Sequence, residues 1–169
     1  MRLYATKLPA LASELVRALL GASAIEAESP AEVERDVEAV LGSYIKIDQE
    51  ASDKARDYIQ QRGLASSEFG RLKRSAAEQL GIKVGDEALD YLLDQLVEML
   101  LHSNNVDEVF AQDHELRRAM TPILKKHVAL EGEIEQEARA QLKHVREGTS
   151  TWEVEYRRVM ADIRRRKGL

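Results

Sequence analysis

ELVRALL, residues 14–20, recurs in the second half of the chain as QLVEMLL, residues 95–101. Leucine and valine hold the same four positions in both stretches: Leu15, Val16, Leu19 and Leu20 in the first, and Leu96, Val97, Leu100 and Leu101 in the second. Apolar residues at this spacing line one face of an α-helix. Each stretch therefore predicts an amphipathic helix, and their likeness indicates that the chain repeats itself.

The recurrence extends through three further helical patterns, which keep a constant separation between the two copies. The matched positions of the first copy are Val33, Val37, Val40, Leu41 and Tyr44, then Ala51, Ala55 and Ile59, then Phe69, Ala76, Ala77 and Leu80. Those of the second copy are Leu116, Met120, Ile123, Leu124 and His127, then Ile134, Ala138 and Leu142, then Trp152, Val159, Met160 and Ile163. Such periods indicate repeated structural units. We predict an all-α fold of two tandem four-helix units, residues 1–83 and 84–169, related by internal pseudo-symmetry and packed into one helical bundle.

Capping signals support these boundaries. Ser29 and Ser150 each begin an S-x-x-E capping box, and Pro30 would occupy the first helical position. Gly81 ends the last helix of the first unit, and the junction after it is too short to serve as a flexible linker, so the two units should pack together. Pro122 lies inside a helical pattern and predicts a kink or a break there.

The composition is that of an ordinary globular protein, with 44% hydrophobic and 33% charged residues. Cysteine is absent, which excludes disulfides, thiolate zinc sites and cysteine nucleophiles. No run approaches the roughly 18 apolar residues that a membrane span needs, and Lys7, Glu14 and Arg17 interrupt any signal-like segment near the N-terminus. We therefore expect a cytoplasmic protein with no membrane partner.

Charge is unevenly distributed along the chain, whose net charge is −5. Residues 84–116 contain nine carboxylates and no Lys or Arg, whereas the last thirteen residues are basic. The cations of this tail are Arg157, Arg158, Arg164, Arg165, Arg166 and Lys167. They could neutralise phosphates of RNA or DNA, with Trp152 and Tyr156 stacking on bases. Alternatively, the aromatic residues are buried and the cations lie on the outer face, or the tail pairs with the acidic segment 84–116.

HSNNVDEVFAQDHELRR, residues 102–118, stands between two strongly apolar segments. As a structural corner, it would hold a short helix capped by Asn105, a second helix capped by Asp113, and Phe110 as a buried apolar plug. As a metal site, it would use histidine and carboxylate ligands suited to zinc or manganese. The candidate ligands are His102, Asp107, Glu108, Asp113 and His114.

The first copy has no counterpart of Phe110, His102 or His114, so a purely structural corner does not account for them. We expect a partner-binding surface here, with Asp107, Glu108 and Glu115 as its candidate residues. No nucleophile elbow, Walker sequence or dinucleotide fingerprint is present, and we expect neither an enzyme nor a cofactor. The favoured function is a non-enzymatic protein-interaction or adaptor module, whose partner is another protein or a second copy of the chain. The alternatives are nucleic-acid binding through the basic tail and a divalent-metal site at His102, Asp113 and His114.

LLHSNNVDEVFAQDHELRRAMTPILKKHV, residues 100–128, resembles a bacterial family known as domain of unknown function (number 507). The N-terminal MRLYATKL and a late pattern, consisting of Gly148, Ser150, Trp152, Glu153, Val154, Tyr156 and Arg157, are similar to it as well. The likeness extends over essentially the whole chain. It implies a small helical bacterial protein, and it brings no activity, cofactor or catalytic residue.

Overall fold

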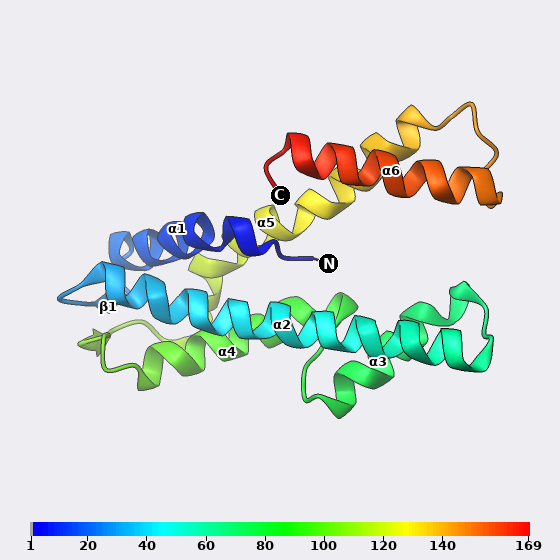
Figure 1. Ribbon diagram of the computed structural model, residues 1–169. Coiled ribbons are helices and arrows are strands. Elements are labelled where there is room, and N and C mark those ends of the chain that lie inside the picture. Colours follow the sequence, from blue (N-terminus) through cyan, green and yellow to red (C-terminus); the bar gives the residue numbers. More distant parts are fainter. Residues whose placement is uncertain (1) are drawn as a thin grey trace.

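Six α-helices and one pair of very short strands make up the computed structural model, which describes residues 2–169 (Figure 1). The helices are α1 (Leu8–Gly21), α2 (Pro30–Arg62), α3 (Phe69–Gln79), α4 (Ala88–His102), α5 (Asp113–Gln141) and α6 (Ser150–Arg166). The strands are β1 (Ile25–Glu26) and β2 (Glu108–Val109), and single 3-10 turns (Ala5–Lys7, Ser66–Glu68 and Gly85–Glu87) precede α1, α3 and α4. The prediction of a predominantly helical fold is confirmed.

A four-helix bundle forms one end of the molecule. It consists of α1, α2, α4 and the first part of α5; α1 packs on α2 and α5, and α4 packs on the same two helices. Four of the repeated leucines lie at its centre: Leu15, Leu19 and Leu96 are 0% exposed, and Leu100 is 1% exposed. Burial of such side chains is worth about 1.5–3 kcal/mol each, so the apolar stripe seen in the sequence is what holds the bundle together.

Two arms extend from the bundle (Figure 1). The long helices α2 and α5 continue beyond it, and α3 packs back on α2 as α6 packs back on α5. The α5–α6 arm has its own small core, to which the N-terminal segment contributes Tyr4. The buried residues of this core are Tyr4, Ile134, Ala138, Met160 and Ile163.

We expected four helices in each half of the chain, and the structure has three in each half. The patterns at 33–44 and 51–59 belong to one helix, α2, and those at 116–127 and 134–142 lie along α5, apart from Leu142 at its C-terminal cap. The segment between the first two patterns, IKIDQE, contains no Gly or Pro to end the helix. In α5, Gly132 costs only about 1 kcal/mol as a helix residue, and the helix also continues through Pro122 without a break.

Two of the expected caps differ from the structure. The Ser29 side chain makes no capping hydrogen bond, although Pro30 does begin α2. The cap of α6 is Thr149 rather than Ser150, and its hydroxyl accepts a hydrogen bond from the Trp152 backbone N–H at 3.2 Å. Gly81 follows the end of α3 with φ of +78°, a conformation that favours glycine. This turn directs Ile82, 2% exposed, into the core.

Candidate functional site

The loops that follow α1 and α4 meet at the outer end of the bundle and form an antiparallel strand pair. Ile25 lies opposite Val109, and Glu26 lies opposite Glu108. The backbone N–H of Asp107 donates to the Glu26 carbonyl at 2.8 Å, and that of Phe110 donates to the Ala24 carbonyl at 2.9 Å. The short helix expected to start at Asn105 is therefore absent, because this backbone forms hydrogen bonds to the other loop.

Asp36 of α2 fastens the Ser-Asn-Asn turn that leads into β2. Its Oδ2 accepts hydrogen bonds from Ser103 Oγ at 2.5 Å and from Asn105 Nδ2 at 2.9 Å. Ser103 Oγ in turn accepts from the Asn105 backbone N–H at 3.0 Å. The Asn105 side chain, expected to cap a helix, thus holds the turn against α2.

Gln112 caps α5 in place of Asp113. Gln112 and Glu115 form a capping box, in which the Gln112 backbone N–H donates to Glu115 Oε2 at 2.8 Å. Asp113 is the first residue of the helix and accepts from Arg117 Nε at 2.6 Å, while Arg117 also reaches Asp94 at 2.5 Å. These two carboxylates raise the pKa of Arg117 above its usual range. Glu115, expected to contact a partner, has a structural role here.

Phe110 is not the expected buried plug: it is 56% exposed. It lies beside a shallow hollow of about 510 Å³ between the start of α5 and the loop after α1. Most of the lining side chains are small, and the lining consists of Ala22, Ser23, Ala24, Phe110, Ala111, Glu115, Arg118 and Ala119. The apolar side chain that is buried at this end of the bundle is instead that of the strand residue Ile25, which is 3% exposed.

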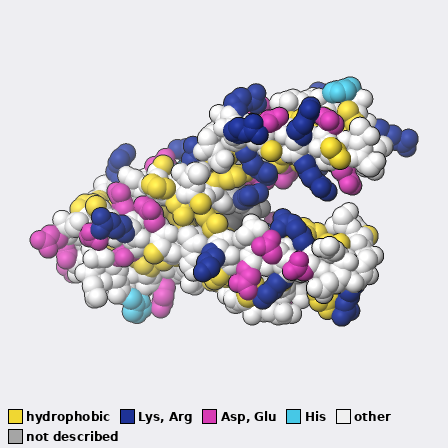
Figure 2. Space-filling view, in the orientation of Figure 1, with side chains coloured by type: hydrophobic (Ala, Val, Ile, Leu, Met, Phe, Trp, Pro, Cys, Tyr) yellow, Lys and Arg dark blue, Asp and Glu magenta, His cyan; other side chains and the backbone are white. Residues whose placement is uncertain are grey.

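Carboxylates gather around Phe110. The ladder holds Glu26 and Glu108 directly opposite each other, and both side chains are exposed, as is that of Asp107. Figure 2 shows Asp and Glu side chains clustered at the end of the molecule that carries β1. Like charges placed directly across a strand pair are destabilising. We call the exposed side chains of Glu26, Asp107, Glu108 and Phe110 the acidic tip.

The candidate metal ligands do not converge. His102 is exposed and its Nδ1 lies 2.9 Å from the Glu98 carbonyl within the same helix, and His114 is exposed on the first turn of α5. Asp113 is held by Arg117. Among residues 2–169, no group of three or more histidines and carboxylates has the geometry to hold a metal ion.

The basic tail is largely paired with carboxylates. Arg164 lies 2.5 Å from Glu131, and both Arg166 and Lys167 contact Glu137, so the partners are on α5 and not in the segment 84–116. Shorter-range pairs within α6 join Arg158 to Glu155 and Arg165 to Asp162, while Arg157 is exposed. Trp152 and Tyr156 stack on each other at 4.6 Å, with Arg139 over both rings. Fewer cations and aromatic faces are thus open to nucleic acid than the sequence indicated.

Sequence reasoning missed three residues of this region: Glu26, Asp36 and Arg117. Glu26 could have been found from the separation of the three later patterns, because the same separation places β1 and β2 at matched positions. No local pattern points to Asp36, because it lies 67 residues before Ser103 in the chain and meets it only through the packing of α2 against α4.

The fold and the tip define an all-α protein built on a four-helix bundle, with an acidic surface at one end. A search of the curated proteins finds no match. The chain matches the family described as "Protein of unknown function (DUF507)" over residues 1–169, and it belongs to that family. Within residues 2–169, no helix is both long enough and apolar enough to cross a membrane.

Proposed function

We propose that this protein is a non-enzymatic protein-interaction module and that the acidic tip is its docking surface. One observation carries the proposal: the strand pair holds Glu26 and Glu108 side by side next to an exposed Phe110. The like-charge pair costs stability in the isolated chain, and the exposed ring of Phe110 contributes none. A like-charge pair in register is a departure from local rules of the kind found at functional sites, and the ring beside it offers apolar surface to a partner.

The partner's chemistry follows from this surface. A basic segment would relieve the repulsion between Glu26 and Glu108, and long-range attraction would speed its association. An apolar side chain of the same segment could pack on Phe110 and enter the neighbouring hollow of about 510 Å³. Aromatic anchors of this kind supply much of the free energy of protein association. We therefore expect a partner segment with Lys or Arg on either side of a Leu, Ile or aromatic residue.

Selection from a displayed library of random peptides tests the proposal without a known partner. Peptides retained by the wild-type chain at low salt should combine basic residues with one apolar anchor. Phe110→Ala and Glu108→Lys should each weaken the binding of a selected peptide by about tenfold or more, because each removes about 1.4 kcal/mol or more of interaction. Raising the salt concentration should weaken binding to the wild type and have less effect on Glu108→Lys.

Glu98→Lys provides the matched control, since Glu98 is an exposed carboxylate on α4 that is not part of the acidic tip. Peptides that bind Glu98→Lys and Glu108→Lys equally weakly would indicate a general charge effect and contradict the proposal. Retention of single-stranded RNA or DNA, lost on Arg157→Glu, would favour the alternative nucleic-acid function instead.

We also propose that residues 1–83 and 84–169 are structural repeats of three helices each. β1 and β2 lie at matched positions of the two copies and pair in the register that a two-fold axis would produce. Arg56 stacks over Phe69 at 5.4 Å, and at the matched positions of the second copy Arg139 stacks over Trp152 at 5.6 Å. Ala27 occupies the place of Phe110 in the first copy, so the exposed aromatic residue of the tip belongs to one copy only.

A further inference from the structure

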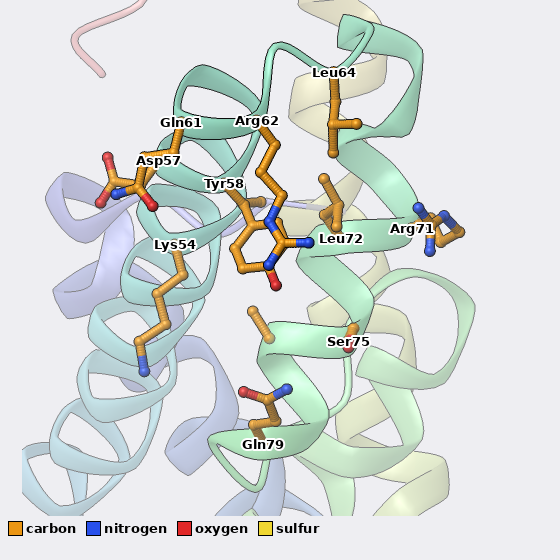
Figure 3. A pocket seen from close by; sticks show the side chains of 12 residues that line it. Lys54, Asp57, Tyr58, Gln61, Arg62, Leu64, Arg71, Leu72, Ser75 and Gln79 are labelled. Atoms are coloured by element: carbon orange, nitrogen blue, oxygen red, sulfur yellow. The ribbon is translucent and has the colours of Figure 1, made fainter.

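A second hollow, of about 680 Å³, lies in the α2–α3 arm (Figure 3). This arm extends away from the end of the molecule that carries β1 (Figure 1). Its base is apolar, with Ala55 and Ala76 on facing helices and Leu64 and Leu72 toward the end of the arm. Its rim is polar. The lining residues are Lys54, Ala55, Asp57, Tyr58, Gln61, Arg62, Leu64, Arg71, Leu72, Ser75, Ala76 and Gln79.

Small side chains keep this hollow open. Ala55 and Ala76 are 2% and 8% exposed, and Ser75 next to Ala76 adds only a hydroxymethyl group. At the matched positions of the other arm, Ser75 and Ala76 are replaced by the bulkier Arg158 and Val159. Gly63, with φ of +61°, turns the chain sharply after α2, so that Leu64 closes the far end of the hollow.

Arg62 lies at the centre of the hollow. Its guanidinium stacks over the Tyr58 ring at 4.6 Å, and Figure 3 shows the two side chains together between the helices. The other two cations are occupied by carboxylates outside the hollow: Lys54 lies 3.1 Å from Glu50, and Arg71 lies 2.5 Å from Glu68. Asp57 lies at the outer edge of α2, away from Arg62 (Figure 3).

The hollow therefore offers one cation that has no carboxylate partner within residues 2–169, and this cation lies beside the apolar base. The planar guanidinium of Arg62 is suited to a two-pronged hydrogen bond with a carboxylate. The tyrosine ring beneath it fixes its orientation and reduces the entropy lost on binding. A single cation matches a single negative charge, and it leaves a phosphate dianion incompletely neutralised.

We infer that this pocket binds a small organic monoanion, a carboxylate with an aliphatic or aromatic body. The carboxylate would lie on Arg62, and the body would lie over Leu64, Leu72 and Ala76. Ser75 and Gln79, on the rim, could donate further hydrogen bonds to a polar substituent. The volume is in the range of pockets that take small organic ligands. This site is separate from the acidic tip and does not depend on the function proposed for it.

Calorimetric titration of the full chain with decanoate and with 1-naphthoate tests the inference. Both should bind saturably, whereas decanol, which lacks the charge, and inorganic phosphate, which lacks the apolar body, should bind at least about tenfold more weakly. Arg62→Gln should weaken decanoate binding by about tenfold or more, because it removes the charged partner. Ser75→Leu should weaken the binding of both carboxylates by filling the hollow.

Arg35→Gln is the matched control, because Arg35 is an exposed arginine of the same helix that pairs with Glu32 outside the hollow. It should bind decanoate like the wild type, and so should Phe110→Ala at the acidic tip. Three results would each overturn the inference: no saturable binding of either carboxylate up to millimolar concentrations, equal binding by Arg62→Gln and Arg35→Gln, or phosphate binding as tight as that of decanoate. None of them bears on the acidic tip, which the peptide selection tests separately.

Discussion

At the scale of single residues, Asp36 joins α2 to the turn before β2 through side-chain hydrogen bonds. One carboxylate oxygen accepts hydrogen bonds from two side chains of the turn before β2, Ser103 and Asn105. Without that oxygen, both donors would be left near the protein surface with only water as a partner. The turn positions β2, and β2 positions Glu108 and Phe110, so Asp36 supports the acidic tip from a distance in the sequence.

We predict that Asp36→Ala lowers the free energy of unfolding by about 1–3 kcal/mol, the usual cost of losing hydrogen bonds to a charged group. Asp36→Asn should cost less, because its amide oxygen can still accept both hydrogen bonds, although without the negative charge that strengthens them. Urea unfolding followed by circular dichroism measures both changes. Glu38→Ala, on the same helix, is the control and should stay within about 0.5 kcal/mol of the wild type. A loss at Asp36 as small as that of the control would mean that the turn does not depend on this carboxylate.

Because of Tyr44, the stability of the bundle should depend on pH in the alkaline range. Its ring is 6% exposed, and its hydroxyl donates to the Lys83 carbonyl at 3.1 Å. Burial is the main cause that raises the pKa of this phenol above its usual value, with the nearby Asp48 and Tyr91 adding to the effect. The folded chain therefore keeps the proton at a pH where the unfolded chain has released it.

Because the pKa of Tyr44 is higher in the folded chain than in the unfolded chain, the effect of Tyr44→Phe on stability should depend on pH. Below about pH 10, the usual pKa of tyrosine, the variant should be less stable than the wild type by about 1 kcal/mol, because it lacks the hydrogen bond to Lys83. Above about pH 10 the wild type should lose up to about 1.4 kcal/mol per pH unit that the variant does not lose, and the difference should close. Urea unfolding of both proteins at about pH 8 and about pH 11 measures it. A difference that stays constant over this range would contradict the assignment.

Phe110 shows why the tip could be predicted from the sequence only in part. The acids at positions 107 and 108 were expected on an outer face, and the structure places them in solvent. The partner role of this stretch was inferred from the difference between the two copies, and it stays a prediction. Whether the aromatic residue that follows them, Phe110, is buried depends on which side chain fills the end of the bundle. That residue is Ile25, and it comes from a loop in the other half of the chain. Local periodicity does not show which of the two side chains, Ile25 or Phe110, fills the end of the bundle.

At the scale of helices, the apolar stripes predicted the buried faces well. The spacing alone placed Leu15 and Leu96 on the apolar faces of their helices, and both are fully buried. Helix ends were predicted less well, because α2 and α5 continue across the segments that separate their apolar stripes. Once a helix is nucleated, each added residue extends it at little cost, so a gap between two apolar stripes does not end it.

Leu15→Ala and Leu96→Ala should each lower the free energy of unfolding by about 2–5 kcal/mol, since each leaves a cavity in the bundle core. Leu101→Ala is the matched control on α4: it belongs to the same repeated stretch, but its side chain is 56% exposed. It should change stability by no more than about 0.5 kcal/mol. Thermal or urea unfolding distinguishes the three. Equal losses at Leu96 and Leu101 would mean that the buried face of α4 is assigned wrongly.

At the scale of the whole molecule, the two arms differ in how they are attached. Buried residues of α3, Ala76 and Ala77, belong to the main core together with those of α1, α2 and α4. The α5–α6 arm has a separate core of five buried residues. A carboxylate adds to its attachment, because Glu131 of α5 accepts from Arg164 of α6 and from the Tyr4 hydroxyl of the N-terminal segment. Small cores of this kind open at lower free energy than the main core of a protein.

We predict that backbone amides of residues 150–166 exchange with solvent through a partial opening, well before those of α1 and α4. Glu131→Gln should speed exchange in α6 by roughly tenfold or more and leave α1 and α4 unchanged, because the amide holds the Arg164 charge less strongly than the carboxylate does. Hydrogen exchange followed by mass spectrometry resolves these segments. Glu133→Gln, a neighbouring exposed carboxylate on α5, should leave all three helices unaffected. If α6 instead exchanges together with α1 and α4 in the wild type, and Glu131→Gln speeds all of them equally, the arm and the bundle unfold as one unit, and Glu131 stabilises the entire molecule rather than the attachment of α6.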